Sequence, residues 1–232
     1  MTMTEHYKFG DNNQVVTTSG NKRFGYNYNE APAAPAVEER AQASGTPTFP
    51  SDDVRARSVF VVHGRDEEVR SAMFELLRRL DLKPLEWEQL VRATGKASPF
   101  LGEVVAHAPS QAQAALVLLT PDDIAKLHPQ LLGDRESADE TQLTGQPRQN
   151  VLIELGMVLM AYPERTVIVE VGRLRQPADT AGRNVIRFDG SEESLRKIVA
   201  RLKVAECQLD DSRGDWLDTS RFENLSAYRR VA

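Results

Sequence analysis

The sequence contains a single cysteine, Cys207, among its 232 residues. One cysteine cannot form an internal disulfide framework or a cysteine zinc cluster, and such scarcity suits a reducing compartment. The four histidines are scattered without metal-ligand spacing, so no metal site is predicted. The chain also lacks an apolar run of membrane-spanning length and an N-terminal apolar core of signal-peptide type. We therefore expect a cytoplasmic protein that does not insert into a membrane.

Positive charge is not in excess either. The net charge is −5 and no basic run stands out, so neither nucleic acid nor an anionic membrane is an expected partner. Phosphate-binding motifs are missing as well. Gly95-Lys96 lacks the upstream glycine and the following Ser or Thr of a P-loop, and no Gly-x-Gly-x-x-Gly occurs. These absences exclude the common kinase, ATPase and Rossmann signatures.

The first 57 residues have the composition of appendages rather than of a core. Residues 1–29 are rich in Asn, Gly, Thr and Tyr, and residues 30–57 resemble a flexible Ala-Pro linker. Phe9-Gly10 and Phe24-Gly25 are each followed by Asn, a repeat whose amide and aromatic side chains suit cross-β stacking. The segment 1–29 is therefore a candidate interaction segment, with a disordered tail or a hairpin docked on a neighbour as alternatives.

From Ser58 onward, short apolar runs alternate with segments of helical periodicity, which is typical of a parallel α/β sheet. Helices are expected after Asp66, over 99–108, across 151–160 and over 192–204, and strands over 58–62, 82–87, 114–119, 166–171 and 185–188. The run at 114–119 is apolar throughout, so it should be buried on both faces near the centre. We predict a flavodoxin-like three-layer domain over residues 58–205, with a five-stranded parallel sheet and a C-terminal tail at 206–232.

Glu154 is the one acid in the apolar stretch 151–160. The stretch predicts a helix that is buried nearly all round, on which a carboxylate must be paired, neutralised or used. A structural acid satisfied by Arg148 or by a backbone amide is the alternative to a functional one. Arg148 itself is either a surface side chain or a ligand of the site, and Asn150 is either an N-cap or a ligand.

Ligands of such sheets bind beyond the carboxyl ends of the strands, which selects the loops at 63–65, 87–98 and 120–123. Gly64 allows a tight turn whose amides could meet a phosphate, and Arg65 adds charge. His63 is either a packed histidine or a base, and Trp87 either packs on the core or stacks on a substrate ring.

Two further segments follow the third predicted strand. Residues 120–123 read as the start of a helix, with Thr120 as its cap and Pro121 in its first turn. Residues 131–146 are too polar for a core and are expected to form a loop beside the site. That loop is a candidate lid or assembly contact, or else an insertion without consequence.

Three motifs carry a resemblance to a known family: VFVVHGRD at 59–66, LLTPDD at 118–123 and PRQNVLIELG at 147–156. They resemble, in this order, the TIR-like family once described as predicted nucleotide-binding proteins, which is similar to TIR effectors of bacterial cyclic-nucleotide anti-phage systems. The resemblance implies a TIR domain over about 57–205, in a family that includes enzymes cleaving NAD, with Glu154 as the catalytic glutamate. Two departures are the segment 92–98, only loosely like the family's Gly-Thr segment, and the lack of a recognisable sensor domain.

The chemistry is compatible with a lone carboxylate. Nicotinamide leaves ribose as a neutral group that needs no proton, whereas ordinary glycosidases need a carboxyl pair to protonate the leaving oxygen. An ionised Glu154 could stabilise the positive charge that develops at the ribose. The resemblance thus implies an NAD glycohydrolase effector of bacterial immunity that acts as a homo-oligomer, with NAD as substrate, no other cofactor, and a possible upstream sensor bound through residues 1–29. The alternative is a non-catalytic TIR module that binds a nucleotide signal or scaffolds a signalling partner.

Overall fold

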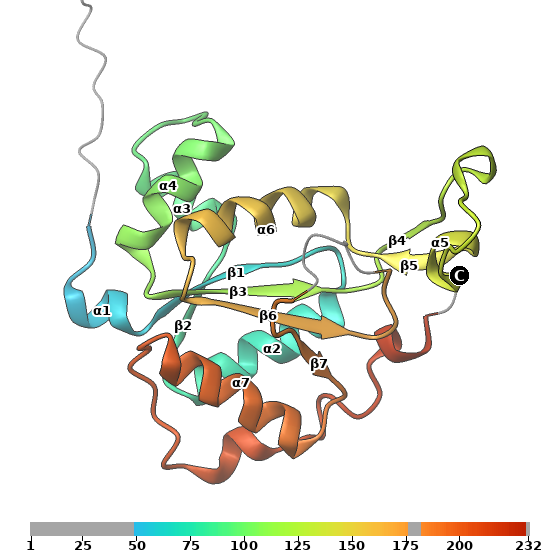
Figure 1. The fold of residues 1–232 in the computed structure, drawn as a ribbon. Coiled ribbons are helices and arrows are strands. Elements are labelled where there is room, and N and C mark those ends of the chain that lie inside the picture. The colour runs from blue at the N-terminus through green and yellow to red at the C-terminus, as the bar shows by residue number, and fades with distance from the viewer. Residues whose placement is uncertain (1–48, 176–181, 231–232) are drawn as a thin grey trace, which may run out of the picture. The chain divides into compact units, whose positions relative to one another are not determined.

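The computed structural model describes residues 49–175 and 182–230, and its centre is a five-stranded parallel sheet in the order β2-β1-β3-β6-β7 (Figure 1). The strands are β1 (Ser58–Val62), β2 (Lys83–Leu85), β3 (Ala114–Leu119), β6 (Thr166–Val171) and β7 (Ile186–Phe188). All four neighbouring pairs are parallel. The predicted flavodoxin-like, three-layer fold is confirmed, with β3 at the centre of the sheet.

Apolar side chains of β3 point alternately into two cores. Leu116 and Leu118 join the core beneath α2 (Glu67–Arg79) and α7 (Glu192–Val204). Ala115, Val117 and Leu119 join the core beneath α3 (Trp87–Ala93), α4 (Leu101–Gln111) and α6 (Gln149–Ala161). Figure 1 shows these two helical layers on opposite faces of the sheet. The apolar run in the sequence is therefore explained by burial on both faces.

Helix α2, the first helix that the sequence predicts, begins where its capping residue indicates. The Asp66 side chain accepts a hydrogen bond from the Val69 amide at 3.0 Å, and α2 starts at the next residue. The expected last helix, 192–204, coincides with α7. By contrast, the strand predicted over 82–87 ends at Leu85, because the Glu86 amide donates to the Gln89 side chain at 2.8 Å and a helix begins there.

The helix predicted at Thr120 is wrong. The Thr120 hydroxyl donates a hydrogen bond to the Asp122 carboxylate at 2.9 Å instead of capping a helix, and the chain continues into β4 (Asp123–Ala125). β4 pairs antiparallel with β5 (Thr144–Gln146), so residues 123–146 form an insertion at one end of the sheet. The expected loop at 131–146 is thus partly regular, since it also holds α5 (Ala138–Thr141) and follows the short 3₁₀ helix η1 (Pro129–Leu131).

Helix α6 is not buried all round, as its sequence had predicted. Val151, Leu155 and Val158 face the core, but Ile153 is 54% exposed and Met160 is 86% exposed. The reason is geometric: α6 lies in the outer layer and packs on the sheet by one side only, so apolar residues on its other side stay uncovered by the described chain. Its uniform hydrophobicity indicated more burial than one layer can supply.

The ends of the described chain are more ordered than their composition suggested. The predicted interaction segment and most of the predicted linker lie outside the described residues, but α1 (Asp52–Ala56) occupies the last part of the linker range. At the other end, residues 206–230 contain η3 (Gly214–Leu217) and η4 (Ser226–Arg229). Five side chains of residues 206–230 are buried in the core beneath α2 and α7: Cys207, Trp216, Phe222, Leu225 and Ala227. Within the described ranges, no helix combines the length and the apolar character needed to cross a bilayer.

The central strand gives a test of the fold. Leu116→Ala removes a side chain with no exposed surface and should lower the free energy of unfolding by about 3 kcal/mol. Val204→Ala, at a position that is 74% exposed, is the control and should change it by less than about 0.5 kcal/mol. Denaturant unfolding followed by circular dichroism measures both. Similar small effects at both positions would contradict the placement of β3 at the centre.

Candidate active site

The candidate site lies at the carboxyl edge of the sheet, where β1 and β3 end side by side. β1 and β3 are paired neighbours, yet β2 lies on the outer side of β1 and β6 on the other side of β3. Chain order therefore reverses between them, which is where open α/β sheets bind ligands. The loop 63–66 follows β1, residues 120–122 follow β3, and α6 begins beyond the insertion.

Asp122 fixes the loop after β1. Its Oδ2 accepts the Arg65 amide at 2.9 Å while its Oδ1 accepts the Thr120 hydroxyl, also at 2.9 Å. A Cβ on Gly64 would lie 1.6 Å from that Oδ2, so the absent side chain makes room for the carboxylate. Gly64 is thus required for this close approach rather than for the positive φ expected of a tight turn, since it is not among the positive-φ glycines. Asp122 therefore holds the loop after β1, a role that differs from the helix start predicted over residues 120–123.

The other residues of the first loop divide into packed and open groups. The His63 ring is half-buried, meets the Phe74 ring edge-on at a centroid distance of 6.0 Å, and has Nδ1 2.9 Å from the Gly64 carbonyl oxygen. These contacts are those of a packed turn histidine. The Arg65 side chain is exposed, while its amide is already used by Asp122 and is not open to a phosphate. Of the donors of Arg65, the guanidinium therefore remains available to an anionic ligand.

Trp87 begins α3 instead of ending a strand. Its ring lies 6.3 Å from the Phe60 ring, tilted by 43°, and it packs on the core beneath α3, α4 and α6. The indole is half-buried, so part of it remains accessible. Core packing is the role that the structure gives it, and stacking on a substrate ring stays a prediction.

Glu154 stands in the second turn of α6 and is half-buried. None of the described residues forms a hydrogen bond or ion pair with its carboxylate, and burial raises its pKa above the ordinary value. Helical spacing places Glu154 and Met157 on the same flank of α6. The Met157 methyl group lies 3.8 Å from where a Cβ on Gly102 would be, so this flank faces the start of α4.

Arg148 and Asn150 also lie at the start of α6, and their roles as ligands of the site stay predictions. Arg148 occupies the N-cap position without a side-chain capping bond, and it forms no ion pair with Glu154. Asn150 is exposed inside the first turn, so its predicted N-cap role is wrong. The first amides of α6 are therefore not capped by a side chain, and a helix start of this kind favours an anion.

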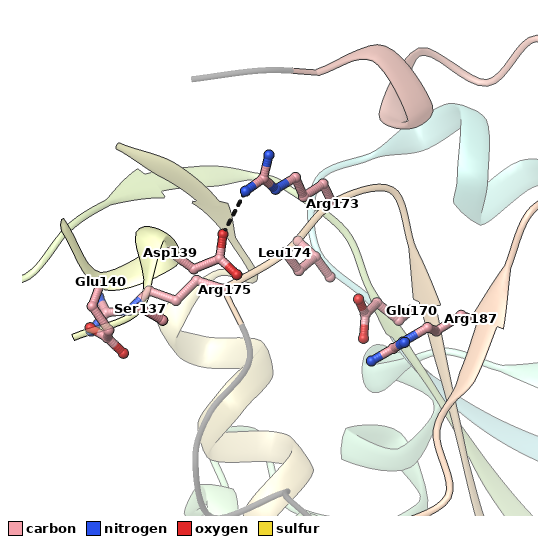
Figure 2. Close-up of a pocket in the computed structure, with 8 residues that line it drawn as sticks. All are labelled: Ser137, Asp139, Glu140, Glu170, Arg173, Leu174, Arg175 and Arg187. Carbon is pink, nitrogen blue, oxygen red and sulfur yellow. Dashed lines mark hydrogen bonds and ion pairs between the residues drawn. The ribbon is translucent and has the colours of Figure 1, made fainter. Parts of the chain in front are cut away.

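A separate pocket of about 320 Å³ lies on the β6–β7 side of the sheet (Figure 2). Charged side chains of both signs line it: Asp139, Glu140, Glu170, Arg173, Arg175 and Arg187, together with Ser137 and Leu174. Arg173 pairs with Asp139 at 2.9 Å and Arg175 pairs with Glu140, so these contacts fasten the insertion to the segment after β6. None of the predicted site residues lines this pocket. Within the described residues, no cluster of three or more His, Cys, Asp or Glu could hold a metal ion.

The raised pKa of Glu154 gives a test by pH. The folded protein binds the proton more tightly than the unfolded chain does, so ionised Glu154 costs stability as pH rises through its raised pKa. Glu154→Gln should therefore melt above the parent protein at pH 7, and the difference should vanish as pH falls below the ordinary value of 4.5. The exposed Glu164→Gln is the control and should show no such dependence. A mutant that melts below the parent at neutral pH would show that the acid is held by a stabilising partner.

Comparison with known proteins identifies the family of the domain. Residues 58–190, more than half of the chain, match the family described as "CAP12/Pycsar effector protein, TIR domain". The chain is also 27% identical over 156 residues to the uncharacterized protein YuaY of Escherichia coli (strain K12), an alignment that covers 67% of this chain and 48% of that protein. The chain thus spans about half the length of this curated relative. The residues matched by the family model include both the loop after β1 and Glu154. The chain belongs to the TIR-domain family of CAP12/Pycsar effector proteins.

Proposed function

We propose that the protein is an anti-phage effector whose TIR domain cleaves NAD to nicotinamide and an ADP-ribose product. The observation that carries the proposal is the half-buried Glu154 carboxylate, which has no partner among the described residues. A carboxylate that is partly desolvated, has a raised pKa and has no partner among the described residues is a candidate functional group. Membership of a TIR effector family supports the same conclusion.

The proposed chemistry uses a single carboxylate. As the bond between nicotinamide and ribose breaks, its electron pair leaves with nicotinamide as a neutral ring, and positive charge develops on the ribose. Water, or a nucleophilic group of the substrate itself where the product is cyclic, then bonds to the anomeric carbon and loses a proton to solvent. Ionised Glu154 stabilises that charge electrostatically and holds the ribose hydroxyls, while partial burial strengthens the interaction by excluding water. The uncapped start of α6, with Arg148 and Asn150, and the exposed Arg65 would bind the pyrophosphate, and no further cofactor is required.

The rival function is a TIR module that binds a nucleotide signal or scaffolds a partner without catalysis. That role would leave Glu154 as a structural acid, for which Arg148 or a backbone amide was the expected partner. Neither forms a bond with it in the described chain, which favours the enzyme.

Two apolar surfaces support action as a homo-oligomer. The insertion exposes Ile124, Leu131, Leu132 and Leu143, and the outer side of α4 and α6 exposes Phe100, Leu101, Ile153 and Met160. Clustered exposed apolar residues mark interaction sites more often than isolated ones do. The second surface includes the helix that carries Glu154, so a neighbouring copy bound there would lie beside the site. Residues 1–29 would then raise the local concentration of copies or bind an upstream sensor.

Catalysis predicts a sharp effect of Glu154→Gln. The substitution keeps the shape of the side chain and removes its charge, so release of nicotinamide from NAD should fall at least about a hundredfold. Activity of the parent protein should also fall as pH is lowered through the raised pKa of Glu154. The control Glu164→Gln should retain parental turnover. Equal turnover in Glu154→Gln and the parent would remove this acid from the reaction.

Assembly predicts that cleavage per site rises with protein concentration. Leu131→Asp places a charge on the insertion surface and should reduce this rise, because a charge in an apolar contact is costly. Val204→Asp, at a comparably exposed position of α7, is the matched control. Removing residues 1–48 should leave a folded domain that needs a higher concentration to act. A constant rate per site across a hundredfold dilution would contradict the requirement for assembly.

A further inference from the structure

The C-terminal segment, residues 206–230, lies beyond the residues that match the family and yet reaches the carboxyl edge of the sheet. Its path is fixed by buried side chains and by backbone bonds, such as Gln208 to the Ala56 carbonyl and Asp210 to the Leu80 carbonyl, both 2.9 Å. Near its end, the Ala227 carbonyl oxygen lies 2.3 Å from where a Cβ on Gly172 would be. The segment therefore packs against the turn that follows β6.

From there the segment contacts the start of α2. The Ser226 amide donates to the Glu68 carboxylate at 2.9 Å, and Nη1 of Arg230 lies 2.9 Å from Oδ2 of Asp66. The Asp66 side chain is only 2% exposed, and Oδ2 has no other polar partner in the described chain. A buried carboxylate oxygen without its counter-ion is strongly unfavourable, so Arg230 is what makes this position of Asp66 stable.

Asp66 terminates the loop that begins at His63. Its other oxygen caps α2 through the Val69 amide, and its neighbour Arg65 donates to Asp122. The loop is thus fixed at two adjacent residues, by Asp122 from the β3 side and by Arg230 from the C-terminal segment. Arg65, the loop residue with an exposed guanidinium, carries the first attachment through its amide and adjoins the second at Asp66.

We propose that Arg230 is a positioning residue for this loop, so that the C-terminal segment sets how tightly the site binds the anionic part of its substrate. Arg230 acts through Asp66 and does not touch the substrate itself. The inference rests on the proposed function where it concerns NAD, but the ordering of the loop can be measured without any substrate.

The experiment compares full-length Arg230→Gln, Arg230→Lys and the neighbouring control Arg229→Gln with the parent protein. Hydrogen exchange is measured on peptides that contain the amides of Arg65 and Val69. In Arg230→Gln the exchange of these amides should rise about tenfold, because Asp66 would turn toward water and release the cap. Arg230→Lys keeps the positive charge and should restore protection, and Arg229→Gln should leave it unchanged. Exchange equal to that of the parent in Arg230→Gln would overturn the proposal.

Steady-state kinetics with NAD form the second measurement. We expect the loop to bind the substrate in its ground state and in the transition state equally well. Arg230→Gln should therefore raise KM about tenfold and leave kcat within twofold of that of the parent protein. Loss of fold alone would lower the active fraction and hence kcat, without changing KM. An unchanged KM in an active protein would overturn the role in binding. A parent protein that does not cleave NAD would contradict the proposed function instead, and the exchange result would still decide the role of Arg230.

Discussion

The structure depends on the burial of its central parallel strands on both faces. Every residue of β3 is at most 4% exposed, and β1 is buried along its whole length. Both faces are occupied by helices, so no polar chemistry can be placed there without loss of stability. The polar groups that remain for function lie where the strands end. That edge contains the loop after β1, Asp122 after β3 and the start of α6. The candidate site is therefore confined to these few segments.

Close packing at the same edge explains several glycines. A Cβ on Gly145 would lie 2.6 Å from Cβ of Pro121, and one on Gly172 would meet the Ala227 carbonyl. The insertion, the loop after β3, the turn after β6 and the C-terminal segment are therefore in direct contact through atoms that leave no space for a side chain. Because packed interiors transmit displacements instead of absorbing them, a shift of one of these segments is expected to move the others.

The sequence predicted the fold well where one physical effect dominates. Apolar runs placed β1, β3 and β6 at their observed bounds, and the capping carboxylate of Asp66 placed the start of α2. Errors arose where local and tertiary effects compete. Thr120 has the chemistry of a helix cap, but its hydroxyl is used by Asp122, and the hydrophobicity of α6 does not reveal that only one layer covers it. The C-terminal segment has no apolar run typical of a core element, and five buried side chains spread along its length attach it to the core.

The sequence singles out the candidate acid, Glu154, but not the residues that hold the loop after β1. Glu154 stands out in the sequence because a carboxylate in an apolar helix is costly, and that cost depends only on local composition. Asp122 and Arg230 act on the loop after β1 from residues far along the chain, so no local pattern reveals them. The residues that hold the loop and the candidate acid also differ in their electrostatic surroundings. Asp66, paired with Arg230, and Asp122, hydrogen-bonded to the Arg65 amide, hold the loop. Glu154 has no partner among the described residues, and its burial makes it harder to ionise. Under the proposed function, the cationic transition state would relieve the electrostatic cost of ionising this one group.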